Sequence, residues 1–326
     1  MRQIVIPKSG EPDVMRVVEC ASPIPGPGEV AIDVEYCGCN WGDTMMRRNT
    51  YPHTVTYPVV PGFEVSGSVS GLGPEVSGLR IGDRVAAYLS EDGGYAETCV
   101  VPAQCVIPLP PSIQLDAAAA FPVQALTAYF MLHLIGRVQP GWVVLIHAVG
   151  GGVGLCLTQL AVKAGAKVIG SVGAAGKERR PLEFGASRVV NREKEDFVAA
   201  ALEMTGGRGV DLLLDSLGAL TLDRSFAALR TLGHAISYGE AEGRPFPNLW
   251  ERMVPKSLTL TRFHMGHVQV GSDDWRTAVS HVLAGIVEGW LRIQIEGIYP
   301  LCEAAAMHTR LESRKVAGKL LLATRE

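Results

Sequence analysis

The sequence predicts an α/β protein of two domains, one built on a doubly wound parallel sheet and the other rich in antiparallel β-structure. Three observations carry this prediction. From position 142 onward short apolar runs alternate with helical segments, and a glycine-rich turn separates the first run from its helix. Before position 110, short alternating runs are separated by glycine and proline turns. A chain of 326 residues is long enough for two domains with a large core.

Residues 142–171 form the stretch around which the second half is organised. The run WVVLIHA (142–148) is apolar and rich in β-branched residues, which is typical of a buried strand. Glycines follow at 150, 151, 152 and 154, and LCLTQLAVKAG then has helical spacing. A second apolar run from Lys167 closes a βαβ unit. Such a turn lets the backbone approach a pyrophosphate beside a helix N-terminus, so we predict dinucleotide binding over an ordinary structural turn.

Composition excludes several function classes. The chain is 47% hydrophobic and 19% charged, as expected for a soluble globular protein. A net charge of -3 argues against binding nucleic acid or an acidic membrane surface. No apolar run approaches the ~20 residues of a membrane span, and MRQIVIPKSG lacks the apolar region of a signal peptide. Seven irregularly spaced cysteines fit a reducing cytoplasm better than a disulfide framework.

The first domain is predicted to be antiparallel, with Greek-key or barrel character. Turn signals recur at 25–28, 71–74 and 93–94, and runs such as EVAIDVEYCG lie between them. The stretch 108–122 carries PLPPS and then DAAAAFP, which indicates a linker into a helix that starts near Val123. We therefore expect the domain boundary there.

The second domain should contain six parallel strands joined by right-handed crossovers. The segment 272–291 has the pattern of a long amphipathic helix with Ser272 as its N-cap. The tail, 297–324, reads as strand, helix and strand, and we expect it to complete the first domain. The expected strands are 142–148, 166–172, 187–191, 210–216, 234–239 and 257–263.

Several motifs in a fixed order give the chain a family resemblance. They are GCNWGDTMMRRNTYP (38–52), YPVVPGFEVSG (57–67), GDRVAAY (82–88), FPVQALTAYF (121–130), HAVGGGVG (147–154), TGGRGVDLLLDSLG (205–218) and LESRKVAGK (311–319). On these motifs the sequence resembles the medium-chain dehydrogenase/reductase superfamily, in its zinc-free quinone oxidoreductase branch. The resemblance implies a GroES-like catalytic domain over 1–120, completed by 266–326, and a Rossmann NADPH-binding domain over 121–265. It also implies a nicotinamide cleft between them and a homodimer formed by edge pairing of the Rossmann sheets.

The same comparison predicts that no metal is bound. In the zinc-dependent members, a cysteine ligand occupies the position of Asn40, and a histidine ligand occupies that of Phe63, before Glu64. A carboxamide is a poor zinc ligand and a phenyl ring is none, whereas catalytic zinc needs three protein ligands. Cys37 and Cys39 share a strand face, but two ligands do not make a site. Without a Lewis acid, simple alcohol oxidation is disfavoured.

The expected cofactor is NADPH. An NAD site usually has an acidic residue at the end of the second strand, but here that strand ends at Gly170, Ser171 and Val172 with no acid. By resemblance, Lys177 and Arg192 match positions that hold the adenosine 2′-phosphate. The alternative is that they are solvated surface charges.

The other cofactor residues are assigned by the same matching. Phe263 and Met265 either form a wall of the nicotinamide pocket or pack in the core. Arg314 either reaches the cofactor or pairs with Glu303 or Glu312. The remaining assignments are Thr127, the turn residues Gly151, Gly152, Val153 and Gly154, then Gly170 and Ser171 at the end of the second strand, and Leu217, Tyr238 and Gly239 after the fourth and fifth strands.

The chemistry expected without a metal is hydride transfer to a quinone, or to the β-carbon of an α,β-unsaturated carbonyl. Negative charge then builds on a carbonyl oxygen, where a hydrogen-bond donor lowers the barrier. Asn40, Tyr51 and a cofactor ribose hydroxyl are the candidates. Tyr51 matches a tyrosine that related enoyl reductases use near the substrate, although it could only position the nicotinamide. Asp43 is a weaker candidate, since it could instead pair with Arg47 or Arg48 and hold the loop.

Two other functions stay open on the sequence alone. One is an enoyl-thioester reductase in a biosynthetic pathway. The other is a non-catalytic NADPH-binding sensor, structural or RNA-binding protein, although the charge balance counts against RNA. His147, at the end of the first strand, is expected to pack beside the glycine turn instead of taking part in catalysis. The stretch 239–250 is expected to be a loop.

Overall fold

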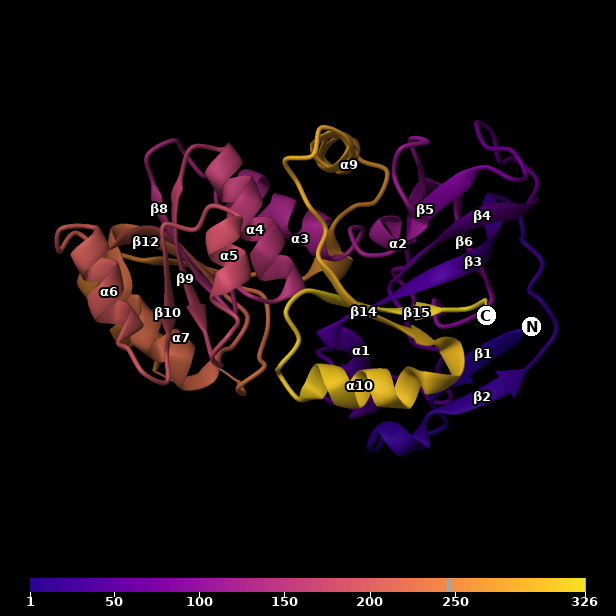
Figure 1. The fold of residues 1–326 in the computed structure, drawn as a ribbon, viewed down its shortest axis with the longest axis horizontal. Helices are drawn as coiled ribbons and strands as arrows, with labels where there is room; N and C mark the ends of the chain where they lie inside the picture. Colours follow the sequence, from indigo (N-terminus) through magenta and orange to yellow (C-terminus); the bar gives the residue numbers. More distant parts are fainter. Residues whose placement is uncertain (245–247, 326) are drawn as a thin grey trace. The chain divides into compact units, whose positions relative to one another are not determined.

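The protein divides into two compact units in a computed structural model that describes residues 1–244 and 248–325 (Figure 1). The first unit consists of Met1–Leu126 and Gln269–Glu326, and the second of Thr127–Val268. The chain divides after residues 126 and 268, compared with the expected boundaries after residues 120 and 265. The C-terminal segment belongs to the first unit, as the strand–helix–strand pattern of the tail led us to expect.

A seven-stranded sheet forms the centre of the first unit. Six strands follow the order β14-β15-β3-β4-β5-β7, and β6 also pairs with β3. All pairings are antiparallel except that of β14 with β15. A separate hairpin joins β1 (Arg2–Val5) and β2 (Arg16–Glu19). The sheet strands are β3 (Glu29–Cys39), β4 (Glu64–Leu72), β5 (Arg84–Tyr88), β6 (Thr98–Pro102), β7 (Val106–Pro108), β14 (Ile295–Pro300) and β15 (Lys319–Ala323).

The sequence predicted one helix of the first unit, α9 (Asp273–Val287), but not another, α1 (Trp41–Arg47). α9 begins where the Ser272 hydroxyl accepts a hydrogen bond from the Trp275 N–H at 3.2 Å, as its N-cap pattern predicted. The other helical segments of this unit are η1 (Pro12–Val14), η2 (Ala103–Cys105), α2 (Leu115–Ala118), η7 (Leu301–Glu303) and α10 (Ala304–Glu312).

The second unit is a six-stranded parallel sheet in the order β10-β9-β8-β11-β12-β13. This is the doubly wound arrangement that the alternating runs predicted. β8 and β11 at its centre are buried along their whole length, which explains why they read as continuous apolar runs. The strands are β8 (Val143–His147), β9 (Lys167–Val172), β10 (Arg188–Asn191), β11 (Val210–Asp215), β12 (Leu229–Ser237) and β13 (Thr259–Arg262).

Helices cover both faces of this sheet. α4 and α5 lie on one side and α6 and α7 on the other (Figure 1). The helix expected near position 123 is α3, and it continues as a π-helical segment, η3. The elements are α3 (Gln124–Tyr129), η3 (Phe130–Ile135), α4 (Gly152–Lys163), α5 (Arg179–Glu183), α6 (Phe197–Met204), α7 (Ala219–Ser225), η4 (Phe226–Ala228), α8 (Leu249–Met253), η5 (Val254–Lys256) and η6 (Met265–His267).

The expected loop at 239–250 is only partly described. Positions 245–247 of that prediction lie outside the described residues, and α8 already begins at Leu249. Among the helices that the structure describes, none is both long and apolar enough to cross a membrane.

Candidate functional site

The predicted pyrophosphate turn lies between β8 and α4. Ala148 has a left-handed backbone with φ of 50°, and α4 begins at Gly152. A Cβ on Gly154 would lie 2.6 Å from the Ala148 carbonyl oxygen, so a side chain there would push the helix away from the strand. The first N–H groups of this twelve-residue helix are therefore held close to the end of β8, where they suit an anion.

His147 lies beneath this turn and ties three elements together. Its Nδ1 is 2.6 Å from the Ser171 hydroxyl and its Nε2 is 2.7 Å from the Ser225 hydroxyl. Ser225 donates its own proton to the Thr221 carbonyl oxygen, so it accepts from His147, and Ser171 donates to the ring. Burial lowers the pKa of His147 to about 3, which keeps the ring neutral. It packs beside the turn, as expected.

Both predicted basic residues lie near the carboxyl end of β9. The backbone of Lys177 approaches Gly150, since a Cβ on that glycine would be 3.1 Å from the Lys177 carbonyl oxygen. The Arg192 guanidinium lies over Gly173, where a Cβ would be 2.6 Å from Nη2. Arg192 is anchored by its N–H, which donates to the Val172 carbonyl oxygen at 3.0 Å. The glycine at 173 is thus what leaves room for a cation at the end of β9.

The loops after β11 and β12 meet at the same edge of the sheet. The Asp215 carboxylate accepts from the Leu217 N–H at 3.2 Å and from the Gly218 N–H at 2.9 Å. Burial raises the pKa of Asp215 to about 6. A Cβ on Gly239 would be 2.6 Å from the Ser216 carbonyl oxygen, so the two loop backbones touch. The Tyr238 N–H donates to the Asp215 carbonyl oxygen at 2.8 Å. Leu217, Tyr238 and Gly239 therefore lie in neighbouring loops.

Fewer contacts define the positions of the other predicted cofactor residues. Thr127 is buried in α3, and Met265 begins η6 after the last strand. Phe263 is buried, and its N–H donates to the Ser237 carbonyl oxygen at 2.8 Å. Arg314 belongs to the first unit and follows α10, so its contact with the cofactor stays a prediction.

Tyr51 belongs to an aromatic pair in the first unit. Its ring stacks on Phe63, with 5.7 Å between centroids and 25° between planes. Gly42 in α1 makes room for the pair, because a Cβ there would lie 3.2 Å from Tyr51 Cε2 and 3.1 Å from Phe63 Cε2. Burial, followed by the nearby Tyr88 and Asp43, raises the pKa of the Tyr51 phenol well above its usual value. The hydroxyl therefore keeps its proton at neutral pH and can donate a hydrogen bond.

Asp43 holds the start of α1. Its fully buried carboxylate accepts from the Asn40 N–H at 2.7 Å and from the Gly62 N–H at 3.0 Å. Burial raises the pKa of Asp43 to about 7. The suggestion that Asp43 pairs with Arg47 or Arg48 is wrong, since Glu312 Oε1 lies 2.5 Å from Arg47 Nη2 and 3.3 Å from Arg48 Nε. Asp43 still holds the loop, through backbone N–H groups.

Asn40 is part of a buried polar cluster with Glu64 and Lys319. The Asn40 amide donates to Glu64 Oε1 at 2.9 Å and accepts from Lys319 Nζ at 2.7 Å. Lys319 also forms an ion pair with Glu64, and both side chains are 0% exposed. Glu64 Oε2 accepts from the Val123 N–H at 2.7 Å. Our sequence reasoning assigned no role to Lys319, because nothing local in LESRKVAGK marks this lysine as buried.

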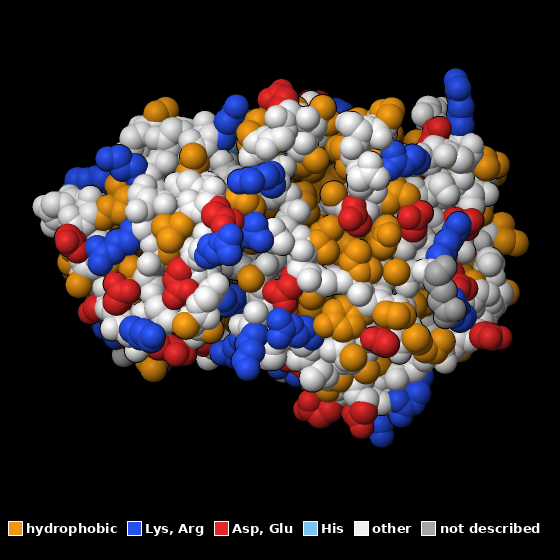
Figure 2. Space-filling model, viewed as in Figure 1, with side chains coloured by type: hydrophobic (Ala, Val, Ile, Leu, Met, Phe, Trp, Pro, Cys, Tyr) orange, Lys and Arg blue, Asp and Glu red, His pale blue; other side chains and the backbone are white. Residues whose placement is uncertain are grey.

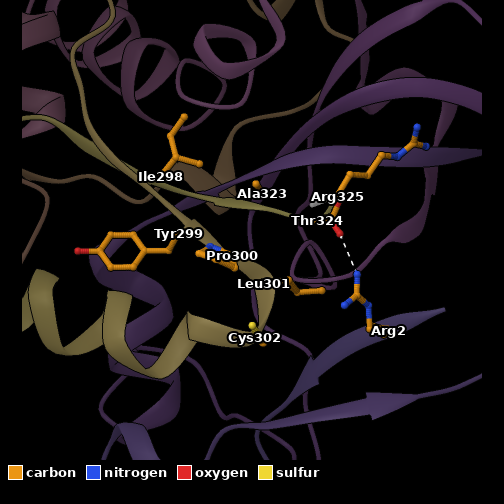
Figure 3. A pocket seen from close by; sticks show the side chains of 9 residues that line it. All are labelled: Arg2, Ile298, Tyr299, Pro300, Leu301, Cys302, Ala323, Thr324 and Arg325. Atoms are coloured by element: carbon orange, nitrogen blue, oxygen red, sulfur yellow. Dashed lines mark hydrogen bonds between the residues drawn. The ribbon is translucent and has the colours of Figure 1, made fainter.

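A shallow pocket of about 250 Å³ elsewhere in the first unit contains none of the predicted site residues (Figure 3). There the Arg2 guanidinium donates to the Thr324 carbonyl oxygen at 3.3 Å. Its lining is Arg2, Ile298, Tyr299, Pro300, Leu301, Cys302, Ala323, Thr324 and Arg325. Figure 2 shows basic and acidic side chains interspersed on the visible face, in keeping with the net charge of -3.

Comparison with known proteins extends over nearly the whole chain. The model of the alcohol dehydrogenase GroES-like domain matches residues 26–111, and that of the zinc-binding dehydrogenases matches residues 152–284. A 2-haloacrylate reductase of a Burkholderia species is 33% identical over 325 residues, which cover 98% of this chain and 97% of the relative.

Two solved structures are similar in both sequence and fold. The crystal structure of Escherichia coli quinone oxidoreductase complexed with NADPH has a TM-score of 0.94 and 33% identity, covering 99% of this chain and 100% of that one. A mycobacterial protein complexed with NADPH has a TM-score of 0.93 and 33% identity, with 99% and 100% covered. The glycine turn, the strand order and these full-length matches all indicate the same family. The chain belongs to the medium-chain dehydrogenase/reductase superfamily, in its quinone oxidoreductase branch.

Proposed function

We propose that the protein is a zinc-independent, NADPH-dependent reductase that transfers hydride to a quinone or to an α,β-unsaturated carbonyl. The observation that carries the proposal is the Arg192 guanidinium over Gly173, at the end of a strand that has no carboxylate and next to the glycine turn. The similar proteins include a quinone oxidoreductase complexed with NADPH and a protein named for reduction of a haloacrylate. When bound, NADPH supplies the hydride.

The residues of the second unit suit this cofactor. The N–H groups at the start of α4 would hold the pyrophosphate, because the helix N-terminus offers free donors and positive dipole. Lys177 and Arg192 would hold the adenosine 2′-phosphate. Arginine suits this role because its planar guanidinium binds phosphate oxygens in pairs. Ser171 and Gly170 leave the end of β9 small and uncharged.

The buried cluster of the first unit supports the zinc-independent part of the proposal. Asn40 and Phe63 stand where zinc-dependent members have ligands. The Lys319 ammonium lies against Glu64 and 2.7 Å from Asn40 Oδ1, so a cation bound to these oxygens would face a positive charge. The zinc-binding dehydrogenase model matches residues 152–284, a range that contains none of these positions.

Tyr51 is the donor that we propose for the substrate carbonyl oxygen. Its raised pKa leaves the phenol protonated at neutral pH, and Phe63 fixes the plane of its ring. Asn40 is a positioning residue in this account, since its amide donates to Glu64 and accepts from Lys319. Charge that builds on the carbonyl oxygen would be stabilised by the phenol O–H.

We further propose a cytoplasmic homodimer. None of the seven cysteines, all of which lie within the described residues, forms a disulfide, which supports a reducing compartment. β13 is an edge strand of the parallel sheet, and pairing with the same strand of a second copy would cover that edge. Light scattering on the purified protein would test the dimer: a monomer mass at micromolar concentration would contradict it.

The substrate class is tested by three acceptors offered with NADPH: 9,10-phenanthrenequinone, a short-chain enal and an enoyl thioester. We expect NADPH oxidation with the quinone or the enal, and with the enal a saturated aldehyde as product. Turnover confined to the thioester would favour the biosynthetic enoyl reductase. NADPH binding without turnover of any acceptor would favour a non-catalytic protein.

A further inference from the structure

Glu242 lies between two partners from different elements. Its Oε1 is 2.5 Å from Arg192 Nη2, and its Oε2 accepts a hydrogen bond from the Thr221 hydroxyl at 2.6 Å. Arg192 follows β10, Thr221 lies in the first turn of α7, and Glu242 lies in the loop after β12. One carboxylate therefore joins three segments at the carboxyl edge of the parallel sheet.

The backbone holds this carboxylate in place. The Glu242 N–H donates to the Leu217 carbonyl oxygen at 2.8 Å, and Gly218 and Gly243 form a β-bridge beside it. The side chains of Arg192 and Glu242 are only 18% and 23% exposed. A pair this well shielded, with a third hydrogen-bonding group on the carboxylate, retains more of its attraction than an exposed surface pair.

The pair involves the cation that we assign to the cofactor. Arg192 reaches across Gly173 at the end of β9 to meet Glu242. A phosphate bound to the same guanidinium would come close to the Glu242 carboxylate, and two anions that share one cation repel each other. No comparable penalty applies to a ribose with a neutral 2′-hydroxyl.

We propose that Glu242 limits the preference of this protein for NADPH over NADH, by competing with the adenosine 2′-phosphate for Arg192. The carboxylate weakens NADPH binding and leaves NADH binding nearly unchanged. It therefore lowers the ratio of NADPH affinity to NADH affinity. This inference rests on the proposed role of Arg192 in holding the 2′-phosphate.

Equilibrium binding tests the inference without any catalytic assay. Titration calorimetry would give dissociation constants for NADPH and NADH, and for the fragments 2′,5′-ADP and 5′-AMP, which differ only in the 2′-phosphate. In Glu242→Gln we expect NADPH and 2′,5′-ADP to bind about 3- to 10-fold more tightly. The affinities for NADH and 5′-AMP should change less than about twofold, which also reports an intact fold.

Glu240→Gln is the matched control. Glu240 lies in the same loop, and its Oε1 is 3.4 Å from Arg262 Nη2 instead of contacting Arg192. We expect both dinucleotides to bind this variant as they bind the original protein. An equal gain in Glu240→Gln and Glu242→Gln would mean that loop charge in general is responsible, and would overturn the proposal.

Arg192→Gln separates this inference from the function on which it rests. If Arg192→Gln loses NADPH affinity but Glu242→Gln leaves it unchanged or weaker, competition by Glu242 is overturned and the phosphate role of Arg192 stands. If Arg192→Gln leaves the ratio of NADPH to NADH affinity unchanged, the phosphate assignment itself fails, and the role of Glu242 fails with it.

Discussion

Lys319 and Glu64 form an ion pair in which both side chains are fully buried. Removing two charges from water costs several kcal/mol for each ion, so such a pair persists only where further hydrogen bonds satisfy both groups. Here Asn40 Oδ1 accepts from Lys319 Nζ, and the Val123 N–H donates to Glu64. The last strand, β4 and the start of α1 are thereby tied to one cluster.

Breaking this pair on one side should destabilise the first unit strongly. We expect Lys319→Met to lower the free energy of unfolding by about 3–5 kcal/mol, because it leaves a buried carboxylate without its partner. Urea unfolding at pH 7 measures the change. The double variant Lys319→Met/Glu64→Gln should recover part of the loss. Arg276→Met is the control: it removes an exposed ion pair, so we expect a change below about 1 kcal/mol. A change this small in Lys319→Met would contradict a buried pair.

His147 makes stability depend on pH below neutrality. Its pKa is about 3 in the folded protein and near 6.5 in the unfolded chain. The neutral ring therefore contributes fully to the free energy of unfolding above pH 6.5, and this contribution is lost as the pH falls from there toward 3. Between pH 7 and pH 5 this costs about 2 kcal/mol of unfolding free energy. In His147→Gln the loss over that interval should be smaller by this amount. Equal slopes in the original protein and the variant would argue against a buried neutral ring.

Removing the Tyr51 hydroxyl should slow the reaction without affecting cofactor binding. Tyr51→Phe keeps the ring that stacks on Phe63 but removes the proposed donor to the carbonyl oxygen. We expect kcat to fall about 100-fold, with the NADPH dissociation constant unchanged. Tyr299→Phe, on β14, is the control. A weaker NADPH complex with kcat retained would show that Tyr51 positions the nicotinamide instead.

Gly173→Ala should displace the Arg192 guanidinium, since the new methyl group would lie 2.6 Å from its Nη2. The end of a flexible side chain can move aside, so we expect little change in stability. NADPH should bind about 10-fold less tightly, in line with the loss of one charge-assisted hydrogen bond, and NADH should be nearly unaffected. Gly297→Ala, whose Cβ would meet its nearest neighbour at 3.5 Å, is the control. Equal losses for both dinucleotides would instead indicate damage to the whole turn.

The parallel sheet and the glycine turn could be predicted because their signals are local. β8 and β11 are buried along their whole length and read as continuous apolar runs, and the turn lies directly after the first of them. α1 was missed, although Asn40 and Asp43 have the spacing of an N-cap pair. Arg192 follows β10, as the strand pattern predicted, but its pairing with Glu242 spans 50 residues along the chain.

The cluster of Lys319 and Glu64 lay beyond sequence reasoning for the same reason. The two residues are 255 positions apart, and a lysine at the start of a strand is ordinarily solvated. Only the antiparallel pairing of β15 with β3, which sets Leu320 opposite Cys39, brings Lys319 next to Asn40 and Glu64. Charge partners of this kind depend on tertiary pairing, which local patterns do not encode.

Zinc-independent use of NADPH is tested most directly by NADPH oxidation with 9,10-phenanthrenequinone before and after exhaustive dialysis against a zinc chelator, with NADH run in parallel. We expect oxidation of NADPH to persist undiminished in protein that contains no zinc by elemental analysis, and NADH to be used more slowly. Activity that disappears on chelation and returns with added zinc would contradict the role given to Lys319 and Asn40. A preference for NADH would contradict the role given to Lys177 and Arg192.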